Sequence, residues 1–354
     1  MWAMRALSLP AIGFCFIVPA HLGRPIEPPR SLPPPIPLEE IIPDVEAGAE
    51  GLPRLRSLLI SQGGELRSEH YYNGARRNRT TNIKSASKSV ISALVGIAVD
   101  RGLIEGADAP IGPYFKRYLT GTEAERKRAI TVGDLLSMRS GLETTSNRNY
   151  GQWVASRSWV RFALAQELIA RPGGPMIYST GNTHLLSAIL TQASGTDTWR
   201  FAQEALAEPP GFSLSRWQRD PEGVYFGGNN MAMTPRQMLA FGELYRNGGV
   251  YEGKRVLSRE WIEQSFIPRG RSQYSGNLYG YGWWMRSFAG VETYFAWGYG
   301  GQYVFVLPEL DLTVVATSSV EGGRERRSHR GALFDLLEER LIGPLTVGRV
   351  MLAD

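Results

Sequence analysis

A serine and a lysine stand three residues apart where a long apolar run begins. The segment reads Ser85-Ala86-Ser87-Lys88, and residues 85–100, SASKSVISALVGIAVD, would place apolar side chains on almost every side of a helix. A helix of this kind is usually buried in the middle of a domain. Because residues at i and i+3 lie on one face of a helix, Lys88 can reach the Ser85 hydroxyl. The pattern predicts a serine nucleophile beside a buried lysine.

A lysine in this position can act as the base for the serine. A serine hydroxyl is a poor nucleophile until a neighbouring group removes its proton. Burial disfavours the charged form of a lysine and so lowers its pKa. The free amides at a helix start favour a developing negative charge, so the Ser85 amide can form half of an oxyanion hole. The alternative is a serine cap followed by a solvent-facing lysine, since Ser-x-x-Lys often occurs by chance.

Two further segments offer partners for this pair. Tyr178 stands before a predicted helix in GGPMIYSTGNTHLLSAIL (173–190). A phenol near a lysine ammonium is stabilised as phenolate, and either of the two groups could then pass the proton to the leaving group. Glycines at 298, 300 and 301 precede a strand in AWGYGGQYVFV (296–306), where they would let a substrate approach closely. Taken alone, Tyr178 is better explained as a half-buried loop aromatic, and the glycines fit an ordinary bulge equally well.

The rest of the chain predicts strands at both ends and helices between them. Residues 55–74 and 293–319 each predict a β-hairpin. Residues 101–245 are mostly helical in pattern, and residues 329–342 predict a closing amphipathic helix. This order predicts an α/β (α+β) fold, an antiparallel sheet flanked by helices with a mostly helical insertion.

Two threonines predict helix starts within the helical region. Thr131 stands before the apolar run of ITVGDLLSMRSGLE (130–143), where a threonine hydroxyl can cap the first turn. Thr234 is followed by Pro235, and a proline at the first helical position loses no hydrogen bond.

The first 43 residues predict a targeting segment and a spacer. Residues 1–23 combine Arg5, an apolar stretch and small residues around Ala20, the layout of a secretory signal, although two prolines weaken it. Residues 24–43 are rich in proline and predict a polyproline-like linker, so the folded body should span 44–345. We expect a secreted or periplasmic protein, with a poorly ordered cytoplasmic extension as the alternative.

The composition argues against several other kinds of site. A net charge of +5 is small for 354 residues, and ARRNR (75–79) and EGGRERRSHR (321–330) are predicted to be solvated faces rather than phosphate-binding segments. Cys15 is the only cysteine, and the four histidines form no HExxH pair, which argues against a disulfide and a metal site. We therefore expect no cofactor, no metal, no nucleic-acid partner and no stable membrane insertion after processing; the oligomeric state stays open.

Taken together, the segments resemble the serine β-lactamase and penicillin-binding-protein superfamily. The closer resemblance is to the class C β-lactamase-like esterases and amidases, among them the 6-aminohexanoate-dimer hydrolases. It covers roughly residues 45–342 in five ordered stretches, which are NIKSASKSVISALVGIA, ITVGDLLSMRSGL, PMIYSTGNTHLLSAIL, TPRQMLAFGELYRNGG and GYGGQYVFVLPELDLTVV. The resemblance implies a β-lactamase/transpeptidase-like fold and a serine hydrolase acting on small esters or amides.

The resemblance also implies roles for individual residues. Ser85 would form the acyl-enzyme with Lys88 as its base partner, and Tyr178 would serve as base and then acid. The Gln302 amide would complete the oxyanion hole with the Ser85 amide. The predicted substrate-binding residues are Tyr299, Gly300, Gly301, Thr180, Asn182, Trp284 and Tyr150. The tryptophans 283 and 284 are expected chiefly to pack in the core, with at least one aromatic facing the acyl pocket.

Two elements depart from the β-lactamase pattern. Thr180 stands where the family's Tyr-x-Asn element has asparagine, and Asn182 follows two positions later. Tyr299-Gly300-Gly301 stands in place of Lys-Thr-Gly, which removes a cation that would hold a carboxylate. Both departures argue against β-lactam hydrolysis and D-alanyl-D-alanine peptidase activity, and they favour small esters or unusual amides.

Other functions remain open on the sequence alone. They are a β-lactamase-like binding or sensor module without turnover, a transacylase that shares the acyl-enzyme, and a D-alanyl-D-alanine peptidase. The intact Ser85, Lys88 and Tyr178 argue against a binding module. A Ser-His-Asp hydrolase would need a Gly-x-Ser-x-Gly turn, which the sequence lacks, and His184 is expected to pack or cap its helix.

Overall fold

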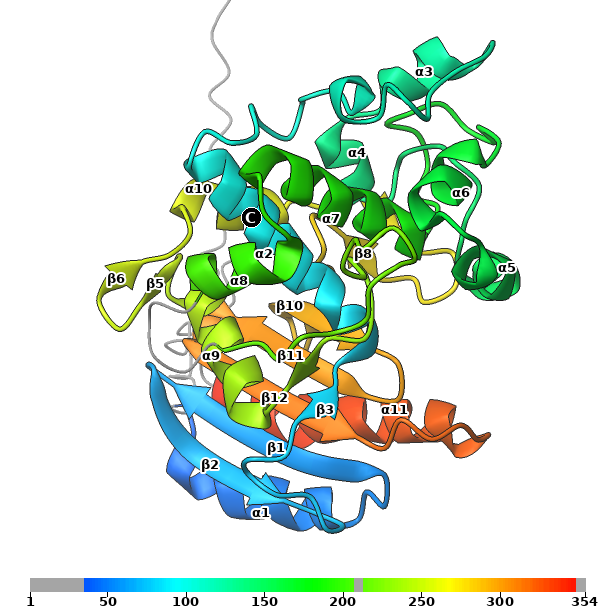
Figure 1. The fold of residues 1–354 in the computed structure, drawn as a ribbon. Helices are drawn as coiled ribbons and strands as arrows, with labels where there is room; N and C mark the ends of the chain where they lie inside the picture. The colour runs from blue at the N-terminus through cyan, green and yellow to red at the C-terminus, as the bar shows by residue number, and fades with distance from the viewer. Residues whose placement is uncertain (1–34, 207–212, 348–354) are drawn as a thin grey trace, which may run out of the picture.

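Both ends of the described chain contribute strands to one antiparallel sheet. The computed structural model describes residues 35–206 and 213–347. Eight strands lie in the order β2-β1-β12-β11-β10-β9-β8-β7, as Figure 1 shows in part. The predicted fold class is confirmed. The strands are β1 (Leu55–Gln62), β2 (Glu65–Tyr71), β7 (Gly270–Arg271), β8 (Leu278–Tyr279), β9 (Trp284–Phe288), β10 (Val291–Gly298), β11 (Gln302–Leu307) and β12 (Leu312–Ser318).

Two hairpins form where the sequence predicts them. β1 and β2 turn at Gly63 and Gly64, whose φ angles of 63° and 83° lie in the left-handed region that glycine adopts without steric cost. A 3₁₀ turn, Pro308–Leu310, joins β11 to β12. Because every residue of β11 and β12 is buried, a slip of one residue would misplace both faces, and the register of these central strands is strongly fixed.

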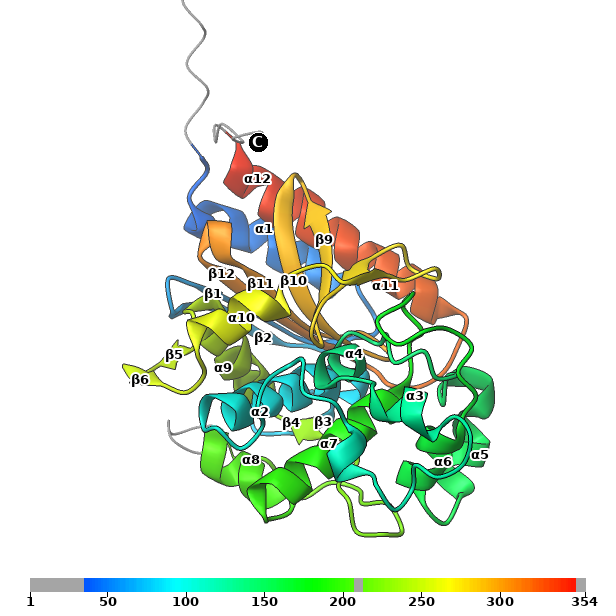
Figure 2. The same ribbon diagram turned by 90° about the horizontal axis from the view of Figure 1, so that it is seen from above.

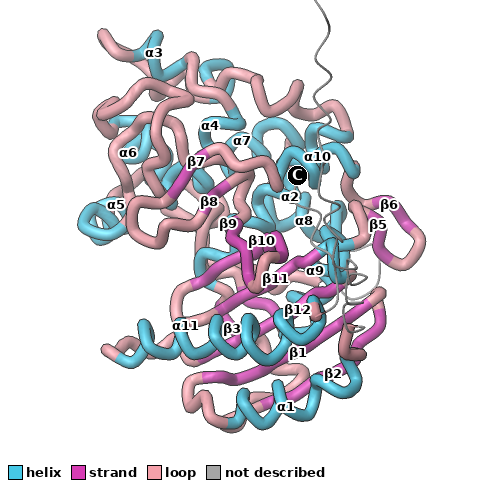
Figure 3. The backbone as a smooth tube through the Cα atoms, turned by 180° about the vertical axis from the view of Figure 1, so that it is seen from behind, coloured by secondary structure: helices cyan, strands magenta, loops and turns pink. Residues whose placement is uncertain are grey.

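Helices cover both faces of this sheet. One face lies under α1 (Leu38–Glu50), α11 (Glu325–Asp335), a π-helical segment (Leu336–Ile342) and α12 (Gly343–Thr346), and Figure 3 shows α1 and α11 in front of the strands. On the other face α9 (Pro235–Arg246) packs on β12, β11 and β1. Gly242 permits this contact, because a Cβ there would lie 2.5 Å from Thr313 Cγ2.

A mostly helical region lies beside the sheet, with α2 (Ser87–Asp100) between the two (Figures 1 and 2). Twelve of the fourteen residues of α2 are buried, as the all-round apolar pattern predicts. The predicted insertion at 101–245 includes α9, which instead belongs to the sheet layer because its apolar side packs on the strands. The remaining helices are α3 (Ala124–Arg128), α4 (Val132–Leu136), α5 (Tyr150–Ala155), α6 (Trp159–Ala165), α7 (Thr180–Ser194), α8 (Thr198–Leu206) and α10 (Arg259–Ser265).

Two small ladders fix loops around the helical region. β3 (Thr81–Asn82) pairs with β4 (Ala232–Met233), which joins the segment before Ser85 to the segment that follows residue 228. β5 (Val250–Tyr251) pairs with β6 (Lys254–Arg255) in a short hairpin after α9.

Both predicted helix caps form. Thr131 and Asp134 make a reciprocal capping box, and Thr234 makes another with Gln237. The helix after Thr131 is shorter than the pattern 130–143 predicts. It ends at Leu136 because Met138 has φ 61°, a left-handed conformation that a helix does not continue.

The ordered body begins earlier than the predicted boundary at residue 44. α1 starts at Leu38 and includes Pro43, so residues 38–43 are helical rather than part of a polyproline-like linker. Leu38, Ile41 and Val45 are buried on one side of α1, and this burial stabilises the helix despite the proline. The predicted signal segment, 1–23, lies outside the described residues. Among the helices that are described, none is both long and apolar enough to span a bilayer.

Candidate active site

Ser85 lies in a tight turn at the foot of α2. The turn is a 3₁₀ segment, Lys84–Ala86, and its first residue, Lys84, has φ 52°. A non-glycine residue in this region is strained and needs support from its surroundings. The support comes from the Lys84 amide donating to Asn82 Oδ1 at 2.9 Å and from the Ser87 hydroxyl donating to the Lys84 carbonyl at 2.6 Å. The Met231 amide donates to Ser87 Oγ in turn, so Ser87 fixes the turn that holds Ser85.

Lys88 lies one turn into α2 with its ammonium nitrogen beside the Ser85 hydroxyl. The residue is only 2% exposed, and Nζ lies 3.2 Å from Ser85 Oγ. Its other polar neighbours are Thr180 Oγ1 at 3.3 Å and the Gly228 carbonyl at 2.6 Å. Within the described part of the chain no carboxylate pairs with it. Burial lowers the pKa of Lys88 to about 7, because the charged form loses water and gains no counter-ion.

The contacts of Lys88 suit the neutral amine. A neutral lysine has two N–H donors and one lone pair, and the Gly228 carbonyl can only accept. One N–H therefore faces Gly228, and the second can face Thr180, whose hydroxyl also contacts Ser146 Oγ at 2.9 Å. The lone pair is then free to accept the Ser85 proton. This is the arrangement that a general base requires.

Tyr178 approaches the same hydroxyl from the start of α7. The Thr144 hydroxyl donates to its carbonyl at 2.7 Å, and its ring centroid lies 5.1 Å from Lys88 Nζ. Burial raises the pKa of Tyr178 to about 12, and a hydrogen bond with Ser85 offsets only part of that rise. The phenol is therefore protonated near neutral pH, and the phenolate that a nearby lysine could have stabilised is not the resting form. Tyr178 can serve first as a proton donor.

An aromatic strip extends from Tyr178 along the sheet. Trp284, on β9, stacks on Tyr178 with ring centroids 5.7 Å apart and planes 25° apart. Trp297, on β10, meets Trp284 edge-on at 5.4 Å. Trp283 points elsewhere and packs against Tyr245 in the core. Of the two adjacent tryptophans, Trp284 alone touches a predicted catalytic side chain.

The glycines before β11 allow two close approaches. A Cβ at Gly298 would lie 2.0 Å from the Ile83 carbonyl, so the end of β10 packs directly on the chain leading to Ser85. Gly301 has φ 108°, and a Cβ there would lie 2.8 Å from Ser318 Oγ. Both positions therefore require glycine, and the segment is a close backbone contact beside the nucleophile.

Gln302 begins β11 opposite Gly298 and is fully buried. Its side-chain amide donates to the Ser318 carbonyl at 2.7 Å, which holds the strand end against β12. The role of its backbone amide in an oxyanion hole stays a prediction.

Two arginines of α11 lie over the aromatic residues of β10 and the following turn. The Arg326 guanidinium lies 4.1 Å from the ring centroid of Tyr299, and the Arg330 guanidinium lies 5.3 Å from that of Trp297. Cations in these positions are attracted to the ring faces. The segment 321–330, predicted to be simply solvated, thus places positive charge beside the turn that lacks the family's lysine.

A sequence model of the β-lactamase family, described as Beta-lactamase, matches residues 56–338. The chain belongs to the β-lactamase family.

Relatives of this β-lactamase-family protein include enzymes that act on esters and amides. The 6-aminohexanoate-dimer hydrolase of Paenarthrobacter ureafaciens is 24% identical over 314 residues, which cover 79% of this chain and 77% of that protein. A hydrolase with promiscuous acyltransferase activity, EstCE1, superposes with a TM-score of 0.68 at 17% identity, over 84% of this chain and 99% of that one. A family VIII carboxylesterase superposes with a TM-score of 0.66 at 16% identity, over 86% of this chain and 99% of the carboxylesterase.

The predicted substrate residues of this β-lactamase-family chain have different contacts. Thr180 lies within contact of Lys88, while Asn182 points into α7's buried surroundings and accepts from the Ser140 hydroxyl at 3.1 Å. The Tyr150 hydroxyl accepts from the Asn229 side chain at 3.3 Å. Substrate binding by Asn182 and Tyr150 stays a prediction.

Gly228 also belongs to this β-lactamase-family site, although it is not among the residues predicted from the sequence. Its carbonyl is the nearest polar partner of Lys88, and a Cβ there would lie 2.2 Å from Thr183 Oγ1 and 3.2 Å from Lys88 Nζ. Only glycine fits this position. The adjacent pair Gly227-Gly228 in YFGGNNMAM was the available signal, because paired glycines mark a close backbone approach.

His184 supports the loop that carries Gly228. Its Nε2 lies 3.0 Å from Asp220 Oδ2 with both side chains buried, and the Gly227 amide donates to its Nδ1 at 3.5 Å. Asp220 Oδ1 also accepts from the Glu222 and Val224 amides. The histidine thus packs beneath its helix, as the sequence predicts, and fixes the loop in this β-lactamase-family protein.

The pH dependence of activity should follow the lysine of this β-lactamase-family site. With the neutral amine as the expected base and a Lys88 pKa of about 7, kcat/KM should rise roughly tenfold per pH unit below pH 7 and level off above it. Stopped-flow hydrolysis of p-nitrophenyl acetate between about pH 5 and 9 measures this limb. A rate that does not change across neutral pH would contradict a lysine base.

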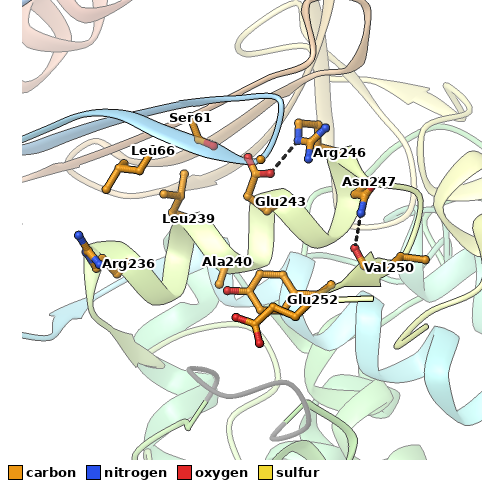
Figure 4. A pocket seen from close by; sticks show the side chains of 12 residues that line it. Ser61, Leu66, Arg236, Leu239, Ala240, Glu243, Arg246, Asn247, Val250 and Glu252 are labelled. Carbon is orange, nitrogen blue, oxygen red and sulfur yellow. Dashed lines mark hydrogen bonds and ion pairs between the residues drawn. The ribbon is translucent and has the colours of Figure 1, made fainter. Parts of the chain in front are cut away.

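A cavity of this β-lactamase-family protein, of about 400 Å³, lies between α9 and the hairpins β1–β2 and β5–β6 (Figure 4). Leu239, Ala240 and the paired Glu243 and Arg246 contribute to it from α9. None of its lining residues is a predicted site residue, so it is separate from the Ser85 site.

Proposed function

We propose that this protein is a serine hydrolase that forms an acyl-enzyme on Ser85 and hydrolyses small esters or amides. The observation that carries the proposal is the buried Lys88, whose lowered pKa and 3.2 Å distance from Ser85 Oγ fit a general base. The protonated Tyr178 beside the same hydroxyl fits a general acid. A binding module would not need a lysine desolvated next to a serine.

The first half-reaction transfers the acyl group to Ser85. Ser85 Oγ attacks the substrate carbonyl carbon while its proton passes to Lys88 Nζ, and backbone amides stabilise the oxyanion. The tetrahedral intermediate then expels the alcohol or amine, which takes the Tyr178 phenol proton. The proton on Lys88 is passed on to the tyrosine oxygen, so both groups return to their resting forms.

The second half-reaction releases the acid. Water attacks the acyl carbon, and its proton passes to the Lys88–Tyr178 pair as the new tetrahedral intermediate forms. Ser85 Oγ then leaves and is reprotonated by the same pair. The same groups therefore serve both steps, as microscopic reversibility requires.

The substrate class follows from the relatives and from Thr180. The named activities of the relatives, a 6-aminohexanoate-dimer hydrolase and a carboxylesterase, support amides and esters as substrates. The Thr180 hydroxyl is held by Lys88 and Ser146, so it is not free to bind an acyl side-chain carbonyl as the family's asparagine would. This supports small esters or amides over β-lactams, and nitrocefin should be a poor substrate.

Fluorophosphonate labelling tests the nucleophile. A phosphonate adduct should form on Ser85 and be absent in Ser85→Ala, as read from intact mass and peptide mapping. Ser89→Ala is the matched control, because Ser89 lies in the first turn of α2, just after Ser85, and its hydroxyl donates to the Gly282 carbonyl at 2.6 Å. A folded wild-type protein that is neither labelled nor active on p-nitrophenyl acetate would instead be a binding module.

Acyl transfer to an acceptor other than water is the second candidate. The similarity to a hydrolase with promiscuous acyltransferase activity favours testing it. Product analysis with an added alcohol would reveal a new ester in place of the free acid.

A further inference from the structure

A small cavity adjoins Tyr178. It has a volume of about 180 Å³ and lies between the 144–147 loop, the 175–178 segment and the tip of the β7–β8 hairpin. Tyr178 itself forms part of its wall. The cavity therefore adjoins a residue of the proposed active site, unlike the one beside α9.

The walls of this cavity are held in place. The Thr144 hydroxyl binds the Tyr178 carbonyl at 2.7 Å, which fixes one wall to the catalytic segment. Gly270, at the base of the hairpin, packs on Met176, since a Cβ there would lie 2.8 Å from Met176 Cβ. The Ser272 hydroxyl accepts from the Tyr274 amide and shapes the hairpin tip. The hairpin is thus anchored at its base beside the cavity floor.

The chemistry of the lining suits an uncharged group. None of the lining residues carries an acidic or basic side chain; the polar ones are hydroxyls and the amides of Asn147 and Gln273. Arg148, next to the lining on the 144–147 loop, is paired with Glu143. A charged group placed here would lose water without gaining an ion pair, which is unfavourable. At about 30 Å³ per water-sized group, the cavity holds about six non-hydrogen atoms.

The direction of proton transfer decides which part of the substrate lies in this cavity. Tyr178 gives its proton to the leaving alcohol or amine, so the leaving atom must lie at the phenol. The chain attached to that atom then begins beside Tyr178, which also lines the cavity. The acyl chain lies on the other side of the carbonyl carbon.

We propose that this cavity is the leaving-group subsite, that it takes an uncharged aliphatic chain of about six atoms, and that Tyr274 closes over it. This rests on the proposed function of Ser85 and Tyr178. Tyr274 is 92% exposed at the hairpin tip and lines the cavity, so its ring is free to lie over a bound chain. A bound chain would bury one face of the ring and gain apolar contact.

Alkyl acetates test the subsite because they share one acyl group and differ little in intrinsic reactivity. The wild-type kcat/KM should be at least tenfold higher for hexyl acetate than for methyl acetate. It should also be higher for hexyl acetate than for 6-aminohexyl acetate, because the cavity offers no anionic partner for the ammonium group. In Tyr274→Ala the hexyl-to-methyl ratio should fall toward one, and in Tyr274→Phe it should persist because the ring remains. Acetate release in a pH-stat gives all three rates.

A series of esters that vary in the acyl chain distinguishes a loss of leaving-group binding from a general loss of activity. The ratio of p-nitrophenyl hexanoate to p-nitrophenyl acetate hydrolysis should be the same in wild type and Tyr274→Ala. A wild-type enzyme indifferent to the length of the alcohol, or a Tyr274→Ala variant altered in acyl preference instead, would overturn the subsite while leaving the hydrolase intact. If no ester is hydrolysed and Ser85 takes no phosphonate, the proposed function itself fails.

Discussion

Replacing Lys88 with methionine should lower kcat/KM for p-nitrophenyl acetate by roughly 10³-fold, within the range that a positioned general base contributes. Methionine fills a similar volume, so the buried site stays packed while the base is lost. Steady-state hydrolysis at about pH 8 measures the effect. The control is Lys84→Met, four residues earlier on the same segment, which lies outside the contacts of Ser85 Oγ and should keep most of the activity.

Stability measurements show whether this loss comes from unfolding. The pKa of Lys88 is about 7 in the folded protein and 10.5 in its ordinary state, so between these values the unfolded chain binds more protons. The free energy of unfolding of the wild-type protein therefore increases as pH rises through this window. Below pH 7 the destabilisation caused by burying the charged lysine is present in full. The advantage of Lys88→Met should shrink by about 3 kcal/mol between about pH 6 and 9 in urea unfolding. A pH-independent difference would contradict a buried, desolvated lysine.

Replacing Tyr178 with phenylalanine should produce the second-largest loss, and its size should depend on the leaving group. An alkoxide is too basic to leave without a proton, whereas p-nitrophenolate needs none. We expect roughly a 10³-fold fall in kcat for hexyl acetate and about a tenfold fall for p-nitrophenyl acetate. Parallel kinetics on the two esters measure the difference. Equal losses on both would indicate that the phenol orients Ser85 instead of supplying a proton.

Tyr279→Phe is the matched control for this variant. The Tyr279 ring lies 6.5 Å from Tyr178 and 4.6 Å from Trp284, and its hydroxyl is buried with no hydrogen-bond partner among the described residues. Removing that hydroxyl takes away no contact of the site. Tyr279→Phe should therefore retain both ester activities.

The parts of the fold that could be predicted depend on local chemistry. The glycines of the β1–β2 turn and the capping boxes at Thr131 and Thr234 form from residues a few positions apart, and each is where the sequence predicts it. The burial of α2 follows from its all-round apolar pattern. From that burial the lowered pKa of Lys88 also follows, because desolvation is its only cause.

The parts that could not be predicted depend on contacts between distant segments. The start of α1 was missed because its stability comes from packing against the sheet, which outweighs the local effect of Pro43. Gly228 was missed because a backbone carbonyl carries no side-chain signal, and it lies 140 positions from Lys88. Arg326 was assigned to a solvated face, since nothing in its own segment indicates that α11 places it over Tyr299.

The long-range contacts of Lys88 also bear on the order in which this chain becomes reactive during synthesis. Ser85 and Lys88 are adjacent early in the chain, but Thr180 and Gly228 join the lysine from 92 and 140 positions downstream. Until those residues have emerged and folded, water surrounds the lysine, its amine stays protonated, and Ser85 is an ordinary alcohol. A nascent or unfolded chain therefore cannot acylate itself on cellular esters. In the proposed mechanism, Ser85 becomes reactive only when the tertiary structure around it is complete.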